Sequence, residues 1–313
     1  MLRVIRYGSI GSTMDVAKEL IDAFPTGCMP TSEAPSLWSN PSGAPLAVLD
    51  VPLLTMPHPT LNKHPFAVVA DEQTKGRATN QRRWASSTGN LYMSLVVPNG
   101  MVPGDLMPVL PLYVGLKSRE GIVAAVQGNT TAISMSSRAM LDDQIVALRL
   151  KWPNDVLGEG GRKMMGVLIE SHKDYFVIGI GANVMSAPSQ ESVTALDARE
   201  GRVPGCLVEH FTPEVWKSSA VDLSKEISKA FLNGLVGYAD GLPGITIRQD
   251  VVRNFTKHMD FKAALQKRVE KGNAADPKGG GLVMPLGLND WGLLEVRHVD
   301  SGRKETLSAE YLL

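Results

Sequence analysis

The sequence predicts an α+β protein, with a mixed β-sheet and flanking helices, followed by a small β-barrel. Continuous or alternating apolar runs indicate the strands of the sheet, at residues 2–7, 66–70, 91–97 and 175–184. Apolar stripes of helical period indicate the helices that cover it. Past residue 258, short β segments alternate with Gly, Asn and Asp turns, which is typical of a small barrel. We therefore expect two domains, residues 1–258 and 259–313.

The N-terminal third begins with a strand that leads into a helix. Ser12 or Thr13 is the predicted N-cap, and one face of the helix carries apolar side chains, namely Val16, Ala17, Leu20, Ile21 and Phe24. Residues 25–62 are rich in Pro, Ser, Thr and Gly, so we interpret them as a surface insertion with one candidate strand in LAVLDVPLL.

A long polar loop separates the predicted strands 66–70 and 91–97. It carries two glycines and four cationic side chains, Lys75, Arg77, Arg82 and Arg83. Arginine forks bind carboxylates and phosphates in bidentate geometry, and glycines allow a loop to close. The loop is therefore either a lid for an anionic ligand or a disordered segment.

The second half of the chain supplies the remaining predicted elements. Residues 105–127 are predicted as a helix broken near its start by Pro108 and Pro111, and residues 128–144 as a Ser/Thr-rich connection. Thr212-Pro213 is expected to open a helix that runs to Leu235, and a shorter helix follows over 245–258. The barrel turns are expected at Gly272-Asn273, Asn289-Asp290 and Ser301-Gly302.

Composition excludes several functional classes. The formal net charge is +0 and the pI is near 7.0, so no nucleic-acid or membrane-surface partner is expected. Cys28 and Cys206 form no CxxC pair, and the 6 histidines form no HExxH, so we expect no disulfide framework and no protein-built metal site. No apolar run reaches the roughly 18 residues of a membrane span. The expected compartment is the cytoplasm, with the mitochondrion left open by the arginines of LRVIRY.

Polar and charged side chains suited to a functional site cluster between Leu148 and Ser171, in the segment LRLKWPNDVLGEGGRKMMGVLIES. The segment is predicted as a strand, a polar loop with a glycine turn, and a second strand. Pro153 cannot donate to a sheet, so the chain should leave it where Asn154 and Asp155 follow. The loop is either a solvated hairpin or a site built from its polar side chains, which are Lys151, Asn154, Asp155, Arg162 and Lys163.

This block resembles the KWPND and KxxGxLxE segments of biotin protein ligases. GSTMD and the GIGANV strand resemble other segments of that family, and the polar loop matches it at Gln73, Gly76, Arg77, Arg82, Trp84, Gly89, Asn90, Leu91 and Tyr92. Gly11 stands where the family usually has Asp, and Ala78 and Thr79 replace a Gly and a second Arg. The resemblance implies the class II synthetase-like fold of biotin and lipoate ligases, with an SH3-like C-terminal barrel.

The resemblance implies an activity and a set of site residues. The family uses ATP to form biotinyl-5′-AMP and pyrophosphate, then transfers biotin to a lysine of a carboxylase's biotin carrier domain, and Mg²⁺ is expected with the ATP. It implies Lys163, Arg77 and Asp155 as catalytic residues. It further implies that biotin is bound by Ser12, Thr13, Gln73, Gly76, Arg77, Ala78, Thr79, Lys163 and Gly166, and ATP by Arg82, Trp84, Asn154 and Asn183.

Two other functions stay open. A lipoate or octanoate ligase shares the fold and the lysine, and Thr79 keeps open a binding module that holds biotin or a carrier domain without turnover. Because the chain starts at the first catalytic-domain strand, we expect no DNA-binding domain before it. A homodimer is compatible with the sequence but not predicted by it.

Overall fold

The computed structural model of this 313-residue chain describes most of it. The described residues are 1–26, 42–53, 63–78, 83–128, 135–189, 203–212, 215–239, 241–262, 264–266 and 281–308.

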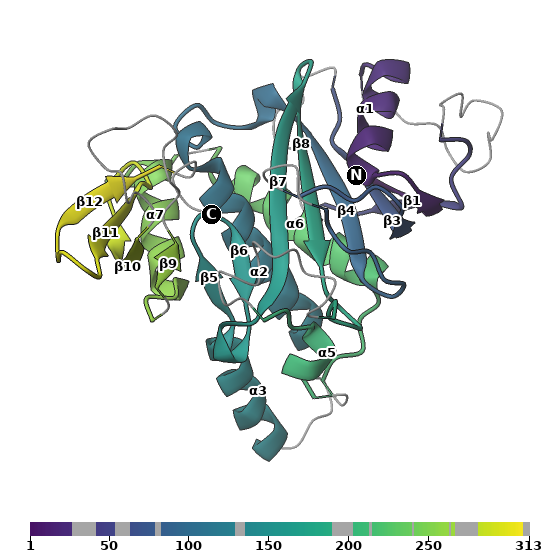
Figure 1. Ribbon diagram of the computed structural model, residues 1–313. Coiled ribbons are helices and arrows are strands. Elements are labelled where there is room, and N and C mark those ends of the chain that lie inside the picture. The colour runs from purple at the N-terminus through teal and green to yellow at the C-terminus, as the bar shows by residue number, and fades with distance from the viewer. Residues whose placement is uncertain are drawn as a thin grey trace.

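A mixed eight-stranded sheet forms the centre of the structure, in the order β2-β1-β3-β4-β8-β7-β6-β5 (Figure 1). Strands β1 and β3 run parallel, and the other neighbouring pairs are antiparallel. The strands are β1 (Leu2–Ile10), β2 (Ala47–Val51), β3 (Phe66–Gln73), β4 (Leu91–Pro98), β5 (Arg149–Lys151), β6 (Asp155–Leu157), β7 (Lys163–His172) and β8 (Tyr175–Ala182). The mixed α+β fold predicted from the sequence is confirmed.

Helices cover both faces of this sheet. Helix α1 (Thr13–Ala23) packs on one face through Val16, Ala17, Leu20 and Ile21, as its apolar stripe predicts, and Ser12 caps it by accepting from the Met14 amide. Helices α2 (Leu110–Gln127) and α6 (Ala220–Gly237) pack together on the opposite face, over the larger core cluster. The remaining helices are α3 (Met135–Ala147), α5 (Leu207–His210) and α7 (Ile247–His258).

A separate four-stranded antiparallel sheet follows α7, in the order β12-β11-β10-β9. Its strands are β9 (Leu265–Gln266), β10 (Leu282–Leu288), β11 (Leu294–His298) and β12 (Lys304–Leu307), seen at one side of Figure 1. Its arrangement agrees with the predicted SH3-like element, and Asn289-Asp290 and Ser301-Gly302 lie at its turns. Gly272-Asn273 lies outside the described residues, and the domain boundary at 258 stays a prediction.

Two helix predictions were wrong. Residues 128–144 were expected to be a connection, yet α3 occupies their C-terminal part and projects from the body in Figure 1. This helix has no apolar stripe, because it is mostly exposed and Leu141 is its one described side chain that is fully buried. The helix expected to open at Thr212-Pro213 begins later, where Ser219 and Asp222 form a capping box. Pro213 lies outside the described residues.

The 148–171 block holds three strands where two were predicted. After β5 the chain turns tightly at Trp152, Pro153 and Asn154, and Asp155 is already the first residue of β6. The glycine turn expected at 158–161 then leads into β7. The polar residues thus lie on a short hairpin at the end of the sheet, where strand pairing fixes their positions.

Candidate active site

On the face of the sheet that α1 covers, two adjacent glycines leave a flat area on which Trp84 packs. Gly166 of β7 and Gly181 of β8 are register partners. A Cβ atom added at Gly181 would lie 2.5 Å from Trp84 Cε2, and one added at Gly166 would lie 2.9 Å from Trp84 Cζ3. Real Cβ atoms do not approach that closely, so this pair of glycines is what allows the flat indole ring to rest on the sheet. We call this feature the glycine slot.

Lys163 and Asp155 form an ion pair at the edge of the glycine slot. Lys163 Nζ lies 2.9 Å from Asp155 Oδ2, and their side chains are 26% and 12% exposed. Lys163 Nζ also lies 5.8 Å from the centroid of the Trp84 ring, within cation–π range. The ammonium therefore has one side toward the carboxylate and one toward the slot. A partly buried cation in such a position attracts anions more strongly than a fully solvated one.

The backbone of Lys163 is held by a crossing segment. Lys163 N donates to Val203 O at 3.1 Å, and Gly205 N donates to Lys163 O at 3.0 Å. The buried Asn183 side chain donates to Gly205 O at 3.0 Å. The Asn183 side-chain amide thus links the end of β8 to β7 and to the 203–205 segment by hydrogen bonds. Its predicted contact with ATP stays a prediction.

A buried polar cluster lies at the N-terminus of α1. Gln73 Oε1 accepts from Thr13 N at 2.8 Å and from Thr13 Oγ1 at 3.2 Å. Ser94 Oγ donates to Thr13 Oγ1 at 2.9 Å. Thr13 and Gln73 are predicted site residues, whereas Ser94 was not predicted, although a lone serine inside the apolar run LYMSLVV was a signal for it. Ser12 serves as the helix cap.

The polar loop is closed by its own backbone near Gly76. Trp84 N donates to Gly76 O at 3.0 Å, and Arg77 pairs with Arg83 in an isolated β-bridge. Gly76 is required there because an added Cβ would lie 2.7 Å from Trp84 O. These contacts hold Trp84 in position over the glycine slot.

The side chain of Arg77 is engaged by two carboxylates. Its Nη2 lies 3.0 Å from Asp15 Oδ1 and 3.6 Å from Glu170 Oε2, and Lys18 also pairs with Glu170 at 2.5 Å. Glu170 was not among the predicted site residues. These ion pairs connect the loop to α1 and β7, and an arginine so placed must exchange partners before it can bind a ligand anion.

The predicted site residues are brought together in part. Trp84 covers the glycine slot, of which Gly166 is a part, and Lys163 lies at its edge, paired with Asp155. Gly76 lies against the backbone of Trp84, and Thr13 and Gln73 contact each other at the N-terminus of α1. Asn154, in the turn of the β5–β6 hairpin, donates to Val167 O of β7 at 3.4 Å. Ala78 is half-buried beside Arg77, and Thr79 and Arg82 lie outside the described residues.

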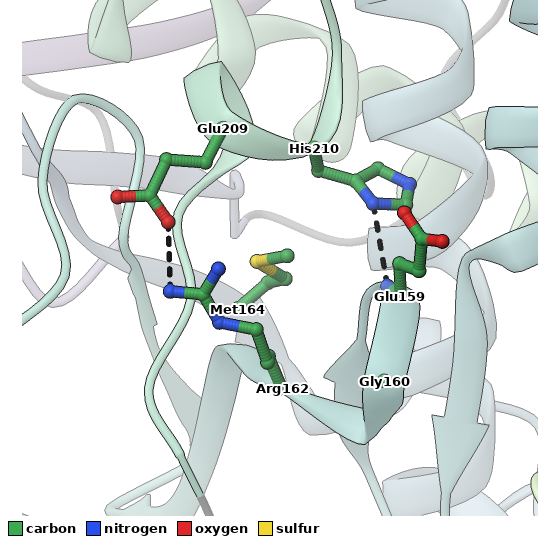
Figure 2. A pocket seen from close by; sticks show the side chains of 6 residues that line it. All are labelled: Glu159, Gly160, Arg162, Met164, Glu209 and His210. Carbon is green, nitrogen blue, oxygen red and sulfur yellow. Dashed lines mark hydrogen bonds and ion pairs between the residues drawn. The ribbon is translucent and has the colours of Figure 1, made fainter.

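A cavity of about 260 Å³ adjoins the start of β7 (Figure 2). It is lined by Glu159, Gly160, Arg162, Met164, Glu209 and His210, of which the sequence suggested Arg162 alone as a possible site side chain. The Arg162 guanidinium lies 2.7 Å from Glu209 across it, so its two main charges neutralise each other. We assign this cavity no ligand.

His210 is held in its neutral form at this cavity. Its Nδ1 accepts from Glu159 N at 3.3 Å, and its Nε2 lies 2.8 Å from Gln144 O, which can only accept. Burial lowers the pKa of His210. Burial, and then the cations Arg119, Arg149 and Lys257, lower the pKa of His258 from 6.5 to about 4. Both histidines thus bind a proton less readily in the folded chain than in the unfolded one.

We expect the protein to lose stability as the pH falls below about 6.5. As the pH falls, the unfolded chain takes up protons at these histidines before the folded chain does. The free energy of unfolding should therefore have its full value above pH 6.5 and decline toward pH 4. Urea denaturation at pH 7.5 and pH 5 measures the difference. His258→Gln should show a smaller pH dependence than the unchanged protein; an equal dependence in both would contradict the assignment.

The described residues contain no group of three or more His, Cys, Asp or Glu placed to hold a metal ion. Among the helices that the structure describes, none combines the length and apolar character needed to span a membrane.

The structure is an α+β domain with a partly buried lysine at the edge of a covered slot. Residues 54–183 match the model of the biotin/lipoate A/B protein ligase family. The crystal structure of biotin protein ligase from Leishmania major with biotinyl-5-AMP is 30% identical, with a TM-score of 0.62, and the match covers 98% of each chain. This chain therefore belongs to the biotin protein ligase family.

Curated relatives match over a shorter stretch. The biotin–[acetyl-CoA-carboxylase] ligase of Mycobacterium tuberculosis is 31% identical over 124 residues, 39% of this chain and 41% of the relative. That of Paracoccus denitrificans is 30% identical over 138 residues, 40% of this chain and 47% of the relative. The aligned part thus spans less than half the length of these two relatives.

Proposed function

We propose that this protein is an ATP-dependent biotin–protein ligase. It forms biotinyl-5′-AMP and pyrophosphate, then transfers biotin to a lysine in the biotin carrier domain of a carboxylase. The observation that carries the proposal is the partly buried Lys163 ammonium, paired with Asp155 at the edge of the glycine slot. The likeness to the Leishmania ligase with biotinyl-5-AMP supports it.

The first half-reaction brings two anions together, the carboxylate of biotin and the α-phosphate of ATP. Lys163 reduces their repulsion and holds them in line, because a fixed cation stabilises the charge that develops between them. Its ammonium turns from Asp155 toward the slot, where the reactants lie. Arg77 supplies a second cation when it leaves Asp15 and Glu170, and Mg²⁺ enters with the ATP.

The second half-reaction needs a lysine amine of the carrier domain that has lost its proton. When Lys163 binds the anions, its 2.9 Å ion pair with Asp155 is broken, and the Asp155 carboxylate can accept a proton from the amine. The β5–β6 hairpin holds that carboxylate rigidly. Asp155 then orients the incoming amine and takes its proton while the amine attacks the biotinyl carbonyl and AMP leaves.

The glycine slot favours a compact fused-ring acid. Trp84 Nε1 is buried and has no hydrogen-bond partner within the described part of the chain, which is a costly arrangement. A ring system that enters between Trp84 and the glycines displaces the indole, which then covers the reactants and keeps water away. The resemblance places Trp84 at the adenine end of the ligand, and that position is compatible with such a displacement.

We propose a carboxylase carrier domain as the partner and the cytoplasm as the compartment, since the two cysteines form no disulfide motif. Nothing in the described residues favours a homodimer.

Labelled biotin, ATP, Mg²⁺ and a generic biotin carrier domain test the proposal, with lipoate in a parallel reaction. We expect label on the carrier lysine from biotin and none from lipoate. Transfer of lipoate instead would identify a lipoate ligase. Tight biotin binding without pyrophosphate release would identify a binding module and refute the ligase.

A further inference from the structure

The turn that carries the catalytic hairpin is tied to the C-terminal sheet. The Trp152 indole is 3% exposed, and its Nε1 donates to Gly292 O at 2.9 Å, across 140 residues of sequence. Trp152 opens the turn whose other end is Asp155. Because only Pro153 and Asn154 separate the two residues, a shift of Trp152 also shifts Asp155.

The segment that accepts this hydrogen bond is itself rigid. In the turn between β10 and β11, Asn289 Oδ1 accepts from the amides of Trp291 and Leu293, each at 3.0 Å. Gly292 has φ of 75°, and an added Cβ would lie 2.8 Å from both Leu112 Cδ1 and Val109 Cγ1. The turn thus presses against the start of α2 and presents its carbonyl at a fixed position. We call residues 289–293 the anchor turn.

Helix α2 holds the same hairpin from a second side. A Cβ added at Gly115 would lie 3.0 Å from Asn154 Cα, so the hairpin backbone rests directly on the helix. On a third side, Asn154 Nδ2 donates to Val167 O at 3.4 Å. Between these contacts the hairpin has little freedom, and the C-terminal sheet contributes the Trp152–Gly292 hydrogen bond to them.

We propose that Trp152 and the anchor turn are positioning elements for Asp155 in the transfer half-reaction. The inference rests on the proposed function. The Trp152 N–H sets the place of the hairpin, and the hairpin sets the direction of the Asp155 carboxylate toward the incoming amine. A displacement of about 1 Å can cost a reaction roughly 100-fold, so a single buried hydrogen bond can control this step.

Activation should depend on this contact much less than transfer. Adenylation relies on Lys163, whose backbone is held separately by the 203–205 segment. Transfer relies on the Asp155 carboxylate, which lies at the start of β6, next to the turn that Trp152 opens. Loosening the hairpin should therefore separate the two rates.

Trp152→Phe tests the inference, because it keeps an aromatic ring and removes the N–H. We expect single-turnover transfer from preformed biotinyl-5′-AMP to fall roughly 10- to 100-fold, while biotin-dependent pyrophosphate exchange stays within about 2-fold. The pH at which transfer is half-maximal should also shift. Gly292→Ala moves the acceptor carbonyl instead of the donor and should give the same separation of rates if the first variant does not fold.

Trp216→Phe is the matched control. Trp216 is 6% exposed, and its Nε1 has no hydrogen-bond partner in the described part of the chain, so the same substitution removes no such bond. It should leave the ratio of transfer to exchange unchanged. Equal losses in both half-reactions for Trp152→Phe, or unchanged transfer in both test variants, would overturn the inference while the unchanged protein still transfers. Absence of transfer by the unchanged protein would instead refute the proposed function.

Discussion

Replacing Lys163 by alanine should lower the rate of adenylate formation by roughly 100- to 1,000-fold, the usual effect of removing one group that stabilises developing charge. The Nζ atom of Lys163 is the cation at the glycine slot, and its loss leaves the biotin carboxylate and the ATP phosphate to repel each other. Exchange of labelled pyrophosphate into ATP, dependent on biotin, measures this step without any carrier domain.

The matched control for this prediction is Lys173→Ala. Lys173 lies in the turn between β7 and β8, is 53% exposed and pairs with Asp22, so the same truncation there removes an exposed surface charge. It should leave exchange unchanged. Biotin-dependent exchange that persists undiminished in Lys163→Ala would remove Lys163 from the chemistry.

Replacing Asp155 by asparagine should slow transfer by roughly 100- to 10,000-fold, the range expected when a general base is lost. The substitution keeps the size of the side chain and removes its charge, so the carrier amine is no longer oriented or deprotonated. Adenylation should change far less, because Lys163 remains. Quenched-flow transfer from preformed biotinyl-5′-AMP and pyrophosphate exchange report the two steps separately.

Asp174→Asn provides the control for this substitution. Asp174 is 75% exposed in the β7–β8 turn, where it pairs with Lys63, and it should be dispensable in both half-reactions. If Asp155→Asn reduces exchange and transfer by the same factor, Asp155 supports the site as a whole and is not the base.

The strands of the main sheet could be predicted because they are buried on both faces, and such strands appear as continuous apolar runs. β4 and β8 are of this kind. Helix α3 could not be predicted, since solvent covers most of it and its sequence carries no stripe. Asp155 was placed in a loop because a three-residue strand is too short to leave a periodic signal.

The sequence marks the candidate site residues by motif, but the contacts between them could not be predicted. Lys163, Asp155 and Gly166 lie in motifs, whereas the Asp15 and Glu170 ion pairs with Arg77 join three segments far apart in the chain. Trp152 and Gly292 likewise belong to different sheets, and nothing local to either residue indicates the other. Contacts of this kind depend on tertiary packing, which periodicity does not record.

The glycine slot restricts how the substrate range of this protein can change. A pocket floor made of Gly166 and Gly181 has no side chain left to truncate, so no substitution there can enlarge it, and every substitution brings a Cβ atom within 3 Å of the indole. Variants selected to accept a bulkier acid should therefore carry their changes in the covering loop, at or near Trp84. Random mutagenesis at these two glycines should yield narrower pockets and never wider ones.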